Sequence, residues 1–151
     1  MKVVGLNGRE YNVDLKKYIV RRDDKTVKSK YHLAARELLN EMFSGYTIVE
    51  EMKLPGSRDP AKKSTLFLDF FIPNLQLGVE VHGQQHYKFC KFFHKTKAGF
   101  LTSVKRDFIK EDWCNLNKIE LIVLKYSDSI EDWRKQIDSR WKIESVFRWY
   151  W

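Results

Sequence analysis

Apolar residues recur along this chain at two different spacings. Between residues 30 and 43 they recur every three or four positions, which is typical of one face of an amphipathic helix. Ser29 stands just before this segment and is a predicted N-cap. The same reasoning predicts a second helix over residues 101–116, and a third that begins after a Ser129-x-x-Asp132 capping box.

Other apolar stretches are short and bounded by turn residues, which is typical of β-strands. The predicted strands cover residues 46–52, 66–72, 77–82 and 119–125. The dipeptide Asn7-Gly8 predicts a tight hairpin near the N-terminus. The last strand follows a helical crossover, so it should lie parallel to an earlier strand. The sequence therefore predicts an α/β fold, with a mixed central sheet flanked by helices.

Asp69 and Glu80 each stand inside an apolar predicted strand, where a carboxylate is costly to bury unless it is paired or binds a cation. If these strands form a hairpin about residues 73–76, Asp69 lies directly across from Glu80, roughly 5 Å away. Two carboxylates at that distance repel each other, and a divalent cation is the usual remedy. The pattern indicates a metal site for phosphodiester hydrolysis; an Asp satisfied by a backbone or arginine partner is the alternative.

Polar residues follow Glu80 directly. His82 projects to the same side of the predicted strand as Glu80, and Gly83 ends the strand, which leaves Gln85 and His86 free to reach over the carboxylates. A histidine near pH 7 can take a proton from water or give one to a leaving oxygen. His86 is therefore a candidate for proton transfer, with ordinary loop polarity as the alternative.

The charge of the chain narrows its class of partner. Lysine and arginine number 28 against 20 aspartates and glutamates, a formal net charge of +8 with an isoelectric point near 9.4. This balance favours a polyanion, with nucleic acid first and an anionic membrane surface second. No apolar stretch is long enough to span a bilayer, and no signal-peptide pattern is present. Cys90 and Cys114 have no metal-type spacing and form no disulfide framework, so a cytoplasmic location is expected.

Basic residues gather in two segments beside the predicted site. Residues 87–100 interleave aromatics with cations, so the lysines can contact phosphates while the rings stack on bases or fill the core. Residues 55–63 form a second basic loop. The candidates for binding nucleic acid are Arg58, Lys62, Lys63, Gln85, Lys88, Lys91, Lys95 and Lys97. The aromatic stretch 141–151 is expected to pack on this chain or on a partner.

Three features in the same order resemble the PD-(D/E)XK nuclease superfamily. They are Asp69, the stretch Glu80-Val81-His82-Gly83-Gln84-Gln85-His86, and the later Arg106-Asp107-Phe108-Ile109-Lys110. Within the superfamily the chain is most similar to small endonucleases related to the very-short-patch repair enzyme, including phage and homing endonucleases. The resemblance spans residues 37–126 and implies a restriction-endonuclease-like fold that hydrolyses DNA with Mg²⁺, for which Mn²⁺ can substitute.

The resemblance implies a role for each matching position of the strands. Asp69 would be the principal metal ligand and Glu80 the second acidic residue, with His86 as the catalytic histidine. His82 departs from the pattern, because relatives often carry Asp there and the wider superfamily carries Lys. The roles left open for His82 are to bind metal, to orient water or to support His86.

Two helical positions are also implied by the resemblance. Glu37 would supply a carboxylate from the first helix, and Asp107 with Lys110 would form a pair on the second; an exposed Glu and a surface ion pair are the alternatives. Asp107 and Lys110 share one face of that helix. The opposing positions are expected to face the core, and they are Phe108, Ile109, Trp113 and Leu116.

The chain is expected to be a single nuclease domain. Residues 1–28 would form the hairpin and a basic connector, residues 29–126 the catalytic core, and residues 127–151 a helix with the aromatic tail. A homodimer or larger assembly is expected, because one metal site cuts only one DNA strand and a two-fold dimer presents two.

The expected function is Mg²⁺-dependent endonucleolytic cleavage of DNA, in repair, recombination or homing. Two alternatives remain open. The chain can be a non-catalytic nucleic-acid-binding protein on a degenerate nuclease fold, or it can hold zinc through His82, His86 and His94, although no Cys pair with ligand spacing lies nearby.

Overall fold

The computed structural model describes residues 1–26 and 28–150, without the side chains of residues 92, 93 and 141–150. Four strands form one mixed sheet in the order β3-β4-β5-β6, so the α/β prediction is confirmed. The bounds of these strands are Val49–Lys53 (β3), Phe67–Ile72 (β4), Leu77–His82 (β5) and Glu120–Lys125 (β6). A separate hairpin, predicted from its Asn-Gly turn, pairs Lys2–Val4 (β1) with Glu10–Asn12 (β2).

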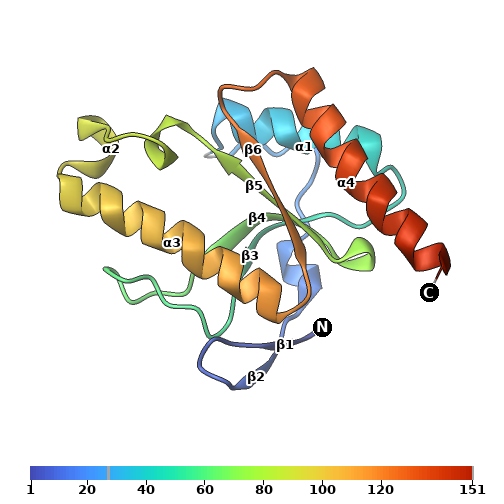
Figure 1. Cartoon of the computed structure of the whole chain (residues 1–151), viewed down its shortest axis with the longest axis horizontal. Helices are drawn as coiled ribbons and strands as arrows, with labels where there is room; N and C mark the ends of the chain where they lie inside the picture. Colours follow the sequence, from blue (N-terminus) through green and yellow to red (C-terminus); the bar gives the residue numbers. More distant parts are fainter. Residues whose placement is uncertain (27, 151) are drawn as a thin grey trace.

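Three long helices cover the sheet (Figure 1). Their bounds are Lys30–Met42 (α1), Lys97–Leu116 (α3) and Ile130–Tyr150 (α4). A single turn, α2, covers Lys91–His94, and short 3₁₀ turns cover Leu15–Tyr18 (η1), Pro73–Leu75 (η2) and Gln84–His86 (η3). The caps expected at the starts of α1 and α4 are confirmed: Ser29 accepts a hydrogen bond from the His32 N–H, and Ser129 exchanges two with Asp132.

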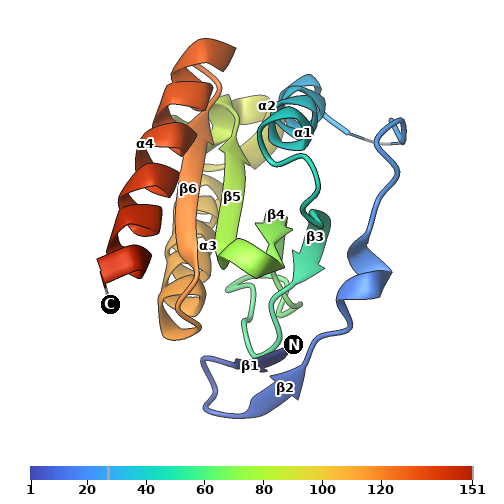
Figure 2. The same ribbon diagram turned by 90° about the vertical axis from the view of Figure 1, so that its right-hand side faces the viewer.

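The helices bury two clusters, one on each side of the sheet. On one side, α1 and α4 pack on apolar residues of β4, β5 and β6, with Trp133 and Ile137 of α4 fully buried. On the other side, Trp113 and Cys114 of α3 meet Phe71 of β4 and the N-terminal hairpin. Figure 2 shows α4 running along the edge strand β6. Helices therefore lie against both faces of the sheet, and at one end of it β5 leads into η3.

The strand pairing agrees with the pairing predicted from the sequence. β4 and β5 pair antiparallel with Phe70 opposite Val79, and Gln76 makes the turn in the left-handed conformation, at φ 50°. β6 returns through α3 and pairs parallel with β5, as the crossover argument predicts. Continuing the β4–β5 register by one residue brings Asp69 to Glu80.

Several boundaries and one helix face were predicted wrongly. β3 begins at Val49 rather than at residue 46, and α3 begins at Lys97 because Thr96 caps it. Phe108 and Leu116 were expected in the core, but 62% and 47% of their surfaces are exposed. Trp113 alone of that set is fully buried, because α3 turns a narrower stripe to the sheet than its apolar content indicates. The expected packing of the aromatic stretch 141–151 concerns side chains outside the described ones.

Candidate functional site

The candidate site begins where the backbone hydrogen bonds between β4 and β5 end and side chains become the acceptors instead. The backbone N–H of Asp69 donates to Oε2 of Glu80 at 3.2 Å, and the backbone N–H of Val81 donates to Oδ2 of Asp69 at 2.8 Å. Glu80 is 2% exposed, whereas Asp69 stays partly accessible. Each carboxylate thus satisfies a backbone donor of the opposite strand. This confirms that the two lie side by side across the hairpin.

The charges of these carboxylates are strongly coupled. Burial and the adjacent negative charge of Glu80 raise the pKa of Asp69 well above its usual value. Lys110 reaches in from α3 and places Nζ 2.6 Å from Oε1 of Glu80. Burial alone would lower the pKa of Lys110, but the charges of Glu80 and Asp69 outweigh it and raise the pKa. One partly buried cation therefore faces two carboxylates.

A second cluster lies at the end of β5 and joins it to α3. Nδ1 of His86, in η3, lies 2.9 Å from Oδ2 of Asp107, and Nε2 of His82 lies 3.9 Å from Oδ1 of the same residue. The two imidazole rings stack with their centroids 3.9 Å apart. Among the described residues, these three form the one group of at least three possible metal ligands whose ligand atoms lie within 4.8 Å of one another.

The environment of His82 keeps this imidazole neutral near pH 7. The ring is 8% exposed, and its pKa is lowered to about 4, first by burial and then by the nearby charge of His86. The hydroxyl of Tyr87 lies 3.3 Å from Nδ1 of His82. His82 therefore has one ring nitrogen near a tyrosine hydroxyl and the other facing Asp107.

The two sides of the site open into different cavities. A cavity of about 410 Å³ is lined by Glu80 and His82 of β5, by Asp107 and Lys110 of α3, and by residues of β6 and α4. A smaller cavity of about 190 Å³, on the α1 side, is lined by Asp69 together with Lys28, His32 and Glu51. The carboxylate pair is thus reached from both faces of the sheet, with Asp69 toward α1 and Glu80 toward α3.

Glu37 does not join the other predicted site residues. Its carboxylate forms a bidentate pair with Arg22 at 3.0 and 3.2 Å, and both side chains are 60% exposed. Glu37 therefore matches the alternative of an exposed glutamate on the helix surface. The polar side chains that α1 does direct inward are His32 and Arg36, one turn apart on the helix.

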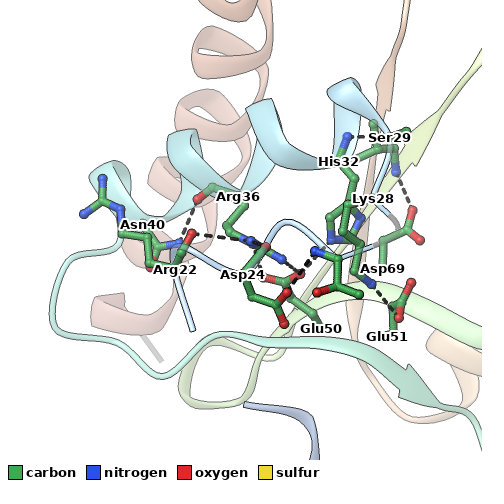
Figure 3. A network of polar contacts seen from close by, with 12 residues as sticks. Arg22, Asp24, Lys28, Ser29, His32, Arg36, Asn40, Glu50, Glu51 and Asp69 are labelled. Carbon is green, nitrogen blue, oxygen red and sulfur yellow. Dashed lines mark hydrogen bonds and ion pairs between the residues drawn. The ribbon is translucent and has the colours of Figure 1, made fainter. Parts of the chain in front are cut away.

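His32 and Arg36 converge on Glu50 of β3, a cluster that the sequence analysis missed. Arg36 donates from Nε and Nη2 to the two oxygens of Glu50, at 2.8 and 2.9 Å, and Nε2 of His32 lies 2.7 Å from Oε1. Figure 3 shows this network, in which Arg36 also donates to the carbonyl of Asp24. A charged residue within the predicted strand 46–52 was the available signal. The network fixes the connector before α1 against β3.

The predicted nucleic-acid-binding side chains lie on the surface. Exposed residues among them are Arg58, Lys62, Lys63, Lys88, Lys91, Lys95 and Lys97, whereas Gln85 is half-buried. The basic loop around Arg58 is tied to α3, because Nε of Arg106 donates to Oδ2 of Asp59 at 2.5 Å. Arg106 stands next to Asp107, so this loop is anchored one residue from the candidate site.

His94 does not belong to the histidine cluster. Its Nδ1 accepts the backbone N–H of Cys90 at 3.0 Å, and its ring contacts those of Phe89 and Phe100. The alternative in which His94 joins His82 and His86 is therefore not the arrangement in the structure. Asp107 occupies the third position.

Comparisons with known proteins give two viral relatives. Uncharacterized protein 307L of Invertebrate iridescent virus 6 is 45% identical over 76 residues, and Uncharacterized protein 033L of Invertebrate iridescent virus 3 is 37% identical over 75 residues. Each match covers 50% of this chain and 39% of the relative, so the matched part spans well under half of these relatives. No family model and no solved structure matches the chain. Among the described residues, none of the helices combines the length and apolar character needed to cross a membrane.

Proposed function

We propose that this protein is a Mg²⁺-dependent DNA endonuclease of the PD-(D/E)XK type, with Mn²⁺ able to substitute. One observation carries the proposal: Asp69 and the buried Glu80 lie side by side where the β4–β5 ladder ends, and β5 leads into η3, where Asp107 orients the ring of His86. The net charge of +8 and the exposed lysines around η3 and α2 supply attraction for a polyanionic substrate.

The donor set fits Mg²⁺. This ion prefers carboxylate oxygens, and it is usually held by one or two carboxylates together with substrate phosphates. Burial first, and then the charge of Glu80, raise the pKa of Asp69, and a divalent cation held by Asp69 and Glu80 would offset the second of these causes. When bound there, the ion supplies positive charge against the oxygens of the scissile phosphate.

The side chains of the protein supply the remaining chemistry. Asp107 accepts a hydrogen bond from His86 and so fixes the ring, leaving Nε2 of His86 to exchange a proton with the attacking water or the leaving 3′ oxygen. Lys110 places a second positive charge beside Glu80, where it can stabilise charge that develops on the phosphate. The hydrogen bonds from the backbone to Asp69 and Glu80 hold both carboxylates in place before substrate arrives.

The contact between Lys110 and Glu80 favours one competing function. In this contact the ammonium group of Lys110 occupies a position beside Glu80 that a metal ion would otherwise take. Such a replacement is expected in a non-catalytic DNA-binding protein on a degenerate nuclease fold. The two functions differ in one measurable respect, since both predict DNA binding and only the first predicts cleavage.

Cleavage of plasmid DNA with Mg²⁺, Mn²⁺ or EDTA tests the proposal directly. We expect Asp69→Asn and Glu80→Gln to abolish nicking while DNA affinity in a gel-shift assay stays unchanged, because each change removes a ligand without altering shape. Glu41→Gln on the exposed side of α1 is the matched control and should cleave like the wild type. Full activity in Asp69→Asn would exclude a metal role for the pair, and an inactive wild type that still binds DNA would establish the non-catalytic function.

A further inference from the structure

We propose that His82, His86 and Asp107 form a binding site for a transition-metal ion of the zinc class, separate from the Asp69–Glu80 pair. Two imidazole nitrogens and one carboxylate oxygen are a recurrent ligand set for Zn²⁺ and related divalent ions. Mg²⁺ instead prefers oxygen ligands throughout. The chemistry of the cluster therefore selects a different cation from that of the carboxylate pair.

The distances within the cluster are close to those that a tetrahedral ion requires. Ligand atoms about 2.1 Å from such an ion are separated from one another by about 3.4 Å. The two observed separations, 2.9 Å from His86 to Asp107 and 3.9 Å from His82 to Asp107, lie on either side of that value. The stacked rings must tilt for both nitrogens to reach one ion. The ring of His86 is the one expected to move, because His86 lies in a short 3₁₀ turn and is only partly buried.

The surroundings of His82 favour the same role. A metal-binding histidine normally engages its second ring nitrogen with a hydrogen-bonding partner that fixes the ring. Tyr87 supplies such a partner, 3.3 Å from Nδ1 of His82, and the other nitrogen faces Asp107. The cavity of about 410 Å³ lined by His82 and Asp107 provides an entry path. Ligand identity, a second partner and access are thus present, and a tilt of the stacked rings would complete the spacing.

The ion would affect the proposed reaction through His86, and this consequence rests on the proposed function. An ion on Nδ1 of His86 would replace the hydrogen bond with Asp107. The imidazole would then keep its proton on Nε2, so this nitrogen could not take one from the attacking water. Zinc should therefore inhibit Mg²⁺-dependent cleavage rather than support it.

Metal binding by the full chain, freed of metal with EDTA, tests the site without any assay of cleavage. We expect calorimetry with Zn²⁺ to show one strong site, and Co²⁺ to give visible absorption bands of a low-symmetry complex. Asp107→Asn and His86→Ala should weaken Zn²⁺ binding by more than roughly 100-fold, which exceeds the usual effect of losing only an outer partner. Both positions are partly exposed, so circular dichroism should show that both variants stay folded.

The controls identify the ligands and separate the two metal sites. His94→Ala and Cys90→Ser remove nearby donors outside the cluster, and Asp69→Asn alters only the carboxylate pair; all three should bind Zn²⁺ like the wild type. Wild-type Zn²⁺ affinity in Asp107→Asn, or loss of binding in His94→Ala, would overturn the assignment. Loss of binding in Asp69→Asn would merge the two sites into one and also contradict it. Added Zn²⁺ should then lower cleavage in the presence of Mg²⁺. If the Zn²⁺ affinities are as expected but the wild type cleaves no DNA at all, the nuclease proposal is contradicted and the zinc site is still supported.

Discussion

Asp69 of β4 and Glu80 of β5 are held side by side by contacts from the protein itself. Each accepts a backbone N–H from the opposite strand, and Lys110 contacts Glu80. These contacts offset only part of the cost, because burial and then the adjacent charge of Glu80 still raise the pKa of Asp69 well above its usual value. The two carboxylates are therefore held in position, and the proposed cation would offset the repulsion between them.

His86 should matter more to cleavage than His82. Its ring lies 2.9 Å from Asp107, whereas the ring of His82 lies 3.9 Å away and is buried and neutral. We expect His86→Ala to lower single-turnover cleavage with Mg²⁺ by roughly 10²- to 10⁴-fold, the range for losing a general acid–base group. His82→Ala should cost less. If His82→Ala proves the more damaging change, His82 is the proton-transfer residue and Asp107 has a different role.

At the scale of elements, the buried Glu50–Arg36 pair joins β3 to α1. Arg36 is 2% exposed and Glu50 is 4% exposed, so removing the charge of Glu50 leaves the guanidinium of Arg36 buried without its carboxylate partner. Glu50→Gln should therefore lower the free energy of unfolding by about 3–5 kcal/mol in chemical denaturation. Glu37→Gln, which breaks the exposed pair with Arg22, should cost less than about 1 kcal/mol. Equal losses in the two variants would mean that burial of the Glu50 pair contributes nothing to stability.

The same pair makes stability depend on acid. Burial would raise the pKa of Glu50, but hydrogen bonds from His32 and Arg36 outweigh it, and the pKa in the folded protein is lowered. A lowered pKa in the folded protein stabilises the fold, and this contribution is complete when the pH is above the pKa of the unfolded state, roughly 4.3. It is lost as the pH falls through the pKa of the folded state. The stability difference between wild type and Glu50→Gln should therefore shrink below about pH 4. A difference that stays constant down to pH 2 would contradict this origin.

Local patterns in the sequence predicted which helices and strands exist better than they predicted where each one begins. The spacing of apolar residues located α1 and β5, and Ser29 and Ser129 marked helix starts, because these features depend on neighbouring residues alone. The hairpin register followed from its turn, so the Asp69–Glu80 contact could be predicted too. The start of α3 was placed too late because Thr96 was not recognised as its cap.

What the sequence could not supply were contacts set by the rotation of helices. Rotation about α3 decides that Phe108 faces solvent while Asp107 meets His86. Rotation about α1 likewise directs His32 and Arg36 to Glu50 and leaves Glu37 outside with Arg22. Arg36 and Glu37, for example, are neighbouring charged residues of α1 and could not be told apart in the sequence. Only the packing of each helix on the sheet distinguishes them.

At the scale of the whole molecule, a net charge of +8 is expected to act through particular surfaces. Lys88, Lys91, Lys95 and Lys97 are all exposed in the segment that follows His86. Each phosphate contact lowers the slope of log affinity against log salt concentration by about one unit, because counterions are released on binding. Replacing all four by Gln should weaken binding to every DNA sequence tested and flatten this slope by up to about four units.

A charge-matched control separates this surface from general attraction. Replacing Lys16, Lys17, Lys118 and Lys135 by Gln also removes four exposed positive charges, but from η1, from the turn before β6 and from α4. This control should lower affinity slightly through long-range electrostatics and leave the salt slope nearly unchanged. Fluorescence anisotropy with one labelled duplex between 50 and 300 mM salt measures both quantities. Equal slopes in the two variants would mean that no localised footprint exists on the segment after His86. An unchanged slope in the first variant, together with a flattened one after replacing Arg58, Lys62 and Lys63, would move the footprint to the loop that Asp59 and Arg106 anchor beside α3.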